Sequence, residues 1–102
     1  MIRFIEVLNQ TDFNPRMERT ATPRFSLSEV WINEKYVVNV KEAVGYQSLL
    51  REGLLPSELD SQHQFTTITI NQGNVAETHV VVGSPTSVAN RLRKEHSNLL
   101  KG

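Results

Sequence analysis

The feature that most constrains the fold is a pair of β-branched runs late in the chain, separated by a short polar connection. Residues 65–70 and 75–82 form these runs, and Asn71-Gln72-Gly73-Asn74 lies between them. A short connection that contains glycine between two such runs predicts a β-hairpin. Alternation along the first run places Phe65 on the face opposite Ile68, so we expect Phe65 to make a separate contact.

Three earlier segments have the apolar patterns of strands. They are residues 2–8, 25–32 and 36–40, the last two around a tight turn at residues 33–35. The apolar residues of the first segment fall on both of its faces, so we expect this strand to be buried on both sides.

A helix is expected at the end of the chain, over residues 84–100. Ser84 can cap it and Pro85 suits its first position, where a missing N–H costs nothing. Val88 and Leu92 recur at helical spacing, so one face can pack on a sheet. The sequence therefore predicts an α+β, mostly β fold: a small twisted antiparallel sheet or partial barrel of four or five strands with a C-terminal helix.

The length of 102 residues suits one domain, 1–102, with two insertions between strands. Residues 9–24 hold two prolines and three arginines and few core-forming residues, so we expect a loop insertion. Residues 45–64 are expected to be a partly helical insertion, because one or two helical turns fit before Gly53 and Pro56. The leucines of this insertion either cap the end of the sheet or form a contact surface.

The amino-acid composition limits the kinds of chemistry and the kinds of partner that we expect. The chain has no cysteine, which excludes disulfides, thiol catalysis and cysteine-ligated metals. Its net charge of +0 gives no overall field that would attract polyanions. With 38% hydrophobic residues the core must be thin, so we expect a homo-oligomer or a protein partner to add stability.

Targeting signals are not recognisable in the sequence. The opening residues lack the apolar run of a signal peptide, and no stretch approaches membrane-spanning length. We therefore expect a cytoplasmic location and no membrane partner.

Residues that carry chemistry lack the spacing that chemistry needs. The three histidines form no His-x-x-x-His motif, and His79 has only Glu77 as a neighbour on its own side of a strand. Glu58 and Asp60 suit a solvated turn, and the glycines never cluster to hold a phosphate. We expect no catalytic residue, no metal site and no cofactor, and we predict that the protein is not an enzyme.

Large apolar residues outside the expected core mark a candidate protein contact. The candidates are Trp31, Leu49, Leu50, Leu54, Leu55 and Phe65. Trp31 lies between two other apolar residues, so either the helix and the insertion cover it or it anchors a partner. The leading hypothesis is a non-enzymatic interaction or regulatory module that self-associates or binds a protein.

Basic residues support an alternative, a nucleic-acid-binding regulator. Residues 85–102 carry four basic groups and one acidic group, whereas residues 25–84 carry three and seven. The candidate contacts, on the helix and the first loop, are Arg16, Arg19, Arg24, Arg91, Arg93 and Lys94. Basic residues late in a helix also complement its dipole, which explains them without a ligand.

Three blocks in order resemble the small flagellar FlbD-type proteins. They are Met1-Ile2 through Leu8-Asn9, residues 29–33 followed by 36–40, and Thr66 to Leu92, about two thirds of the chain. The insertions and the Asn71-Gln72-Gly73-Asn74 connection depart from the family pattern, as in a divergent or virus-encoded relative. The resemblance implies a small accessory module associated with motility, and it supplies no catalytic motif.

Overall fold

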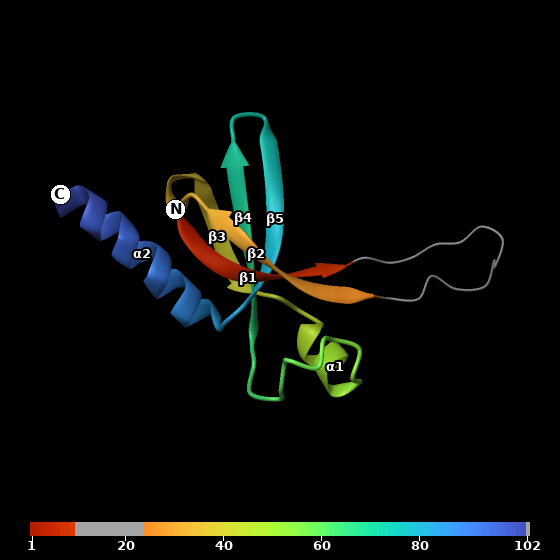
Figure 1. Cartoon of the computed structure of the whole chain (residues 1–102). Coiled ribbons are helices and arrows are strands. Elements are labelled where there is room, and N and C mark those ends of the chain that lie inside the picture. The colour runs from red at the N-terminus through yellow and green to blue at the C-terminus, as the bar shows by residue number, and fades with distance from the viewer. Residues whose placement is uncertain (10–23, 102) are drawn as a thin grey trace.

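The computed structural model describes residues 1–9 and 24–101, with side chains through residue 93. Five strands form one open antiparallel sheet in the order β2-β1-β5-β4-β3 (Figure 1), which confirms the predicted fold class. The strands are β1 (Ile2–Asn9), β2 (Phe25–Ile32), β3 (Val37–Glu42), β4 (Phe65–Gln72) and β5 (Val75–Val82). The helices are α1 (Tyr46–Arg51), α2 (Pro85–Lys101) and a 3-10 turn, η1 (Glu34–Tyr36).

The hairpin of β4 and β5 forms as predicted, with a tighter connection. Gln72 pairs with Val75, so only Gly73 and Asn74 join the strands. Gly73 has a φ of +66°, which glycine adopts without the steric penalty of a Cβ atom.

The segments β2 and β3 do not pair with each other, although they are neighbours in sequence. They form opposite edges of the sheet, and η1 carries the chain between them. The Asn33 side chain accepts a hydrogen bond from the Lys35 backbone N–H at 3.0 Å and so caps this turn. β2 instead pairs along its whole length with β1, from Ile32 opposite Ile2 to Phe25 opposite Asn9.

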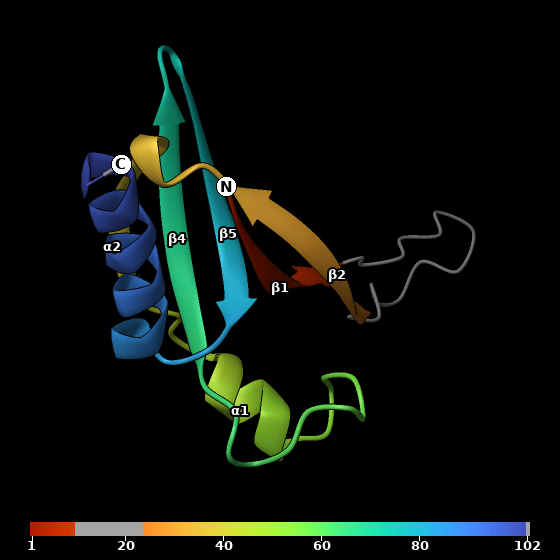
Figure 2. The ribbon, with the colours of Figure 1, turned by 60° about the vertical axis from the view of Figure 1, so that its left-hand side comes forward.

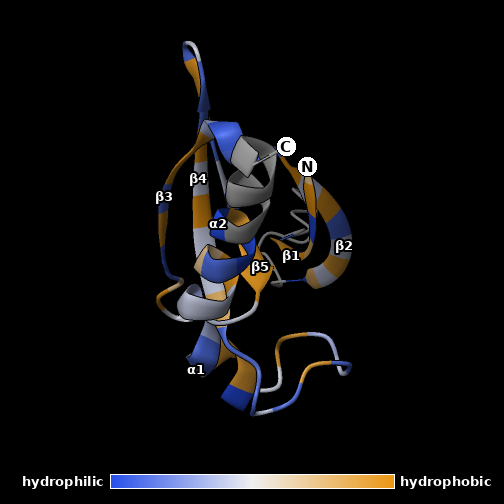
Figure 3. Cartoon of the chain, turned by 90° about the vertical axis from the view of Figure 1, so that its left-hand side faces the viewer, coloured by the Kyte–Doolittle hydropathy of each residue, from blue (hydrophilic) through white to orange (hydrophobic). Residues whose placement is uncertain are grey.

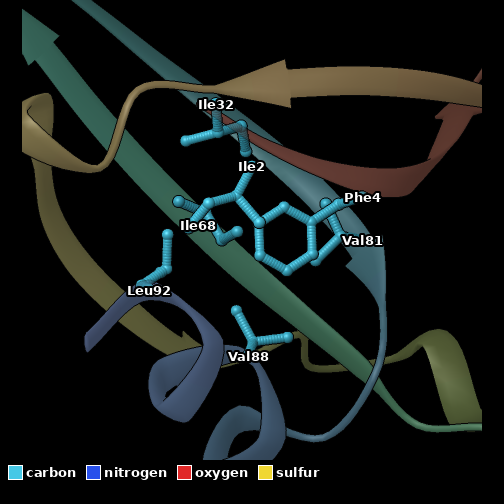
Figure 4. Close-up of a cluster of buried hydrophobic side chains, with 7 residues drawn as sticks. All are labelled: Ile2, Phe4, Ile32, Ile68, Val81, Val88 and Leu92. Atoms are coloured by element: carbon cyan, nitrogen blue, oxygen red, sulfur yellow. The ribbon is translucent and has the colours of Figure 1, made fainter. Parts of the chain in front are cut away.

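A first cluster of buried side chains lies between α2 and the sheet (Figure 4). Its members are Ile2, Phe4, Ile32, Ile68, Val81, Val88 and Leu92. Val88 and Leu92 are the helix residues that the sequence assigned to this face, and both are buried. The strands behind α2 show the matching apolar bands in Figure 3.

A second cluster covers part of the opposite face at the end of the sheet where β4 begins. Its buried members are Val7, Ala43, Leu55 and Phe65, and the ring of Tyr46 packs on it. The Tyr46 ring centroid lies 5.7 Å from that of Phe65. The buried Val7, on the face opposite Phe4, gives β1 the two apolar faces that its sequence predicted.

The C-terminal end of α1 and the N-terminal end of α2 follow their sequence signals. After α1, the Leu54 N–H donates to the Leu49 carbonyl at 3.0 Å and the Gly53 N–H to Leu50 at 3.1 Å, which is the Schellman pattern. Before α2, the Ser84 hydroxyl accepts a hydrogen bond from the Ser87 N–H at 3.1 Å. The helix therefore begins at Pro85, as predicted.

Replacing Val81 with alanine tests the first cluster. Val81 is fully buried, so Val81→Ala removes apolar contacts and leaves a small cavity, with an expected loss of about 2 kcal/mol in the free energy of unfolding. Val75→Ala is the matched control on the same strand, because Val75 is 59% exposed. Its expected loss is below about 0.5 kcal/mol in urea denaturation. Equal losses for both variants would contradict this placement of the core.

Alkaline pH tests the packing of Tyr46. Burial raises the pKa of the Tyr46 hydroxyl above its ordinary value of 10.0. Above pH 10 the unfolded chain ionises more readily than the folded chain, so the free energy of unfolding falls as the pH rises. Tyr46→Phe, which removes the ionisable group, should show a smaller fall between pH 9 and 11.5 in denaturation series. Identical slopes for the two proteins would contradict the burial of this side chain.

Candidate interaction surface

Among the described residues, the second cluster leaves much of the sheet face away from α2 uncovered. The strand register places Trp31 opposite Arg3, Glu29 opposite Ile5, and Thr69 opposite Thr78. We call the uncovered area around Trp31 the open face, and its residues are Arg3, Ile5, Glu29 and Trp31. Strands β1 and β2 form it, neither α1 nor α2 covers it, and Thr69 and Thr78 belong to the separate ladder of β4 and β5.

Trp31 is the largest apolar side chain of the open face. It is 57% exposed, whereas Ile32, the next residue, is 1% exposed because alternation turns it toward α2. Neither α2 nor the described insertion at residues 45–64 covers Trp31, and its role as an anchor for a partner stays a prediction. Tryptophan is enriched among the residues that contribute most to protein interfaces, so Trp31 has the chemistry of an anchor.

An ion pair lies beside Trp31. The Arg3 guanidinium is 2.9 Å from the Glu29 carboxylate, and more than half of each side chain is exposed. Such an exposed pair contributes little to stability. It gives the aromatic group a polar border, which is the arrangement found at many protein interfaces.

The other predicted contact residues gather around α1. Leu49 and Leu50 are half-buried against the second cluster, and Leu55 and Phe65 are buried in it. Only Leu54, at 41%, is exposed among these five. The insertion leucines therefore mainly cap the end of the sheet, which is one of the two alternatives that the sequence allowed.

Trp31 is well separated from this group. Phe25, at the opposite end of β2, packs on the second cluster, and its ring centroid lies 6.3 Å from that of Tyr46. Phe25 and Trp31 are six positions apart along an extended strand, a distance of about 20 Å. The structure does not bring the six predicted contact residues into one patch.

The predicted nucleic-acid contacts do not form one described patch either. Arg91 donates a hydrogen bond to the Arg3 carbonyl at 2.6 Å, and its guanidinium carbon lies 4.4 Å from the centre of the Phe4 ring. Arg93 is exposed on α2, and Arg24 is exposed just before β2 begins. Figure 1 shows α2 and the beginning of β2 on opposite sides of the molecule. Arg16, Arg19 and the side chain of Lys94 lie outside the described residues.

One polar contact was not found from the sequence. His79 Nδ1 lies 2.6 Å from the Glu6 carboxylate, and Nε2 lies 3.4 Å from Glu77. Sequence proximity pointed to Glu77, but the closer partner is 73 residues away and belongs to another strand. The contact joins β5 to β1 next to Glu6 and Val81, which form the only directly opposed pair in the described register of these two strands.

A cavity of about 390 Å³ lies where the insertion meets the sheet, and its polar lining comes from Glu42, Gln47, Ser61, Gln62, His63 and Gln64. Its two ionisable side chains are those of Glu42 and His63. His63 Nδ1 accepts a hydrogen bond from the Asp60 N–H at 3.0 Å, and Gln47 donates to the His63 carbonyl at 2.7 Å. Both contacts hold this insertion together, so they give His63 a structural role at the cavity.

No family model, curated protein or solved structure matches this chain. Over residues 1–9 and 24–101, no helix is both long and apolar enough to cross a membrane. Among the described side chains, no three of histidine, aspartate or glutamate come together as metal ligands.

Removing the Glu6 carboxylate tests the contact between β1 and β5. Glu6→Ala leaves the largely buried His79 without its closest partner, with an expected loss of about 1–3 kcal/mol in the free energy of unfolding. Glu77→Ala is the matched control, because Glu77 is 60% exposed and lies farther from the ring. Its expected effect is below about 0.5 kcal/mol in urea denaturation. A larger loss for Glu77→Ala than for Glu6→Ala would contradict the assignment of Glu6 as the main partner.

Proposed function

We propose that the protein is a small non-enzymatic interaction module that binds a protein partner, either a second copy or another protein, through the open face. The observation that carries the proposal is the exposed indole of Trp31, on a part of the sheet face that no described element covers. The proposal keeps the cytoplasmic location, and it keeps the accessory role that the resemblance to FlbD-type proteins implies.

Water leaves the indole of Trp31 when a partner covers it. A partner that covers an aromatic side chain of this size removes a large apolar area from water. Trp31 is held on a paired strand, with Arg3 opposite it in β1, so little conformational entropy is lost on binding. The Arg3 and Glu29 side chains can exchange water for polar groups of the partner at the border of the contact.

The nucleic-acid alternative has less support. Arg91, one of its six proposed contacts, already binds the Arg3 carbonyl and the Phe4 ring. Binding to RNA or DNA that weakens steeply with salt, and that Arg93→Ala reduces, would favour this alternative.

Fluorescence tests the proposal directly, because Trp31 is the only tryptophan of the chain. At high dilution its emission should be that of a solvent-exposed indole, readily quenched by acrylamide. With rising protein concentration, or on addition of a purified partner, the emission should shift to shorter wavelength and the quenching should fall. Trp31→Ala should weaken the association at least ~30-fold, and Trp31→Phe less.

Two results, obtained together, would contradict the proposal. One is an emission spectrum unchanged at every protein concentration. The other is an affinity column on which the wild-type chain retains no protein beyond what the Trp31→Ala chain retains.

A further inference from the structure

The outer edge of β2 has no neighbouring strand in the described chain (Figure 2). We propose that a second copy of this chain pairs with that edge, β2 against β2 and antiparallel, to form one continuous sheet across a twofold axis. This inference rests on the proposed function and names its partner.

The two edges of the sheet differ in how they resist pairing. β3 has an irregular register between Val37 and Asn39 and carries Lys41 and Glu42, and both an irregularity and charges protect an edge from another strand. β2 is regular over its eight residues and its one charged residue is Glu29, which Arg3 already neutralises. The edge that lacks protection is the one that carries Trp31.

Strand geometry restricts how two copies can meet. An antiparallel continuation across a twofold axis keeps each face of the sheet on the same side, so even residues must pair with even ones and odd with odd. An axis at Glu29 would set two carboxylates directly opposite each other, which destabilises a pair. An axis at Ser28 avoids this and places two small, exposed hydroxyl side chains at the centre.

The Ser28 register gives each side chain a compatible neighbour. Phe25 then lies opposite Trp31 of the second copy, Leu27 opposite Glu29, and Ser26 opposite Val30, each pair occurring twice. The aromatic pairs fall on the face away from α2, where Trp31 is uncovered. Each Glu29 lies diagonal to its twin, and the Arg3 guanidinium 2.9 Å from it offsets that repulsion.

Engineered disulfides test this register, because the chain contains no cysteine of its own. Opposite residues of antiparallel strands have Cα atoms about 4.5–5.5 Å apart, within the range that a disulfide spans. Ser28→Cys should therefore form a covalent dimer under mild oxidation. Ser26→Cys, on the same face and strand, is the matched control: its two copies would lie roughly 13 Å apart along the strands and should stay monomeric on non-reducing gels.

A second variant tests the same pairing without oxidation. Ser28→Lys sets two ammonium groups opposite each other in the dimer but leaves an exposed residue in the single chain. We expect at least a tenfold weaker dimer in sedimentation equilibrium, with the fold of the dilute protein retained in its circular dichroism spectrum.

The outcomes separate this inference from the proposed function. A dimer that Ser28→Cys does not cross-link, or that Ser26→Cys cross-links equally well, overturns the β2 register and leaves the proposed function standing. A monomer at all concentrations that still captures another protein through Trp31 also overturns the inference alone. A monomer that captures nothing overturns both.

Discussion

The first cluster is the contact on which the rest of the fold depends, because the backbone alone barely joins the two parts of the sheet. The described register of β1 with β5 has one directly opposed pair, whereas β4 pairs with β5 from Phe65 to Gln72. Phe4 of β1 and Val81 of β5 are therefore held together mainly by burial against Val88 of α2. The hydrophobic effect has no direction, so the strands can splay here and still share one core.

The polar contact of Glu6 and His79 complements this burial. It lies beside the sparse ladder and supplies a directed interaction that the apolar cluster lacks. Arg91 acts similarly from α2, since it binds the backbone of β1 at Arg3 and covers the Phe4 ring. Directed polar contacts therefore join α2, β1 and β5 in addition to the burial of apolar side chains.

Local signals in the sequence predicted the elements well. The hairpin, the Ser84 cap and the stop of α1 at Gly53 each depend on residues within a few positions of one another. The order of the strands depends on which distant faces match. The turn at Asn33 could not reveal that β2 and β3 lie at opposite edges of the sheet.

The sequence also predicted some residues of the candidate site and could not predict others. Alternation indicated that one of Trp31 and its neighbours must face away from the core, and the structure leaves Trp31 uncovered. The same reasoning could not separate the exposed Leu54 from the buried Leu55, since both are leucines of one irregular loop. Nor could it find Glu6 beside His79, because that proximity exists only once β1 lies next to β5.

The inner place of β1, between β2 and β5, has a consequence for synthesis on the ribosome. β4 and β5 can pair as soon as both have emerged, since a two-residue turn joins them. β1 leaves the ribosome first, yet its second neighbour lies 73 residues later at His79. Such distant contacts close slowly, so the β1 edge that later faces β5 stays open until β5 has been made. The growing chain is most exposed to mispairing there, until the segment that covers it has been made.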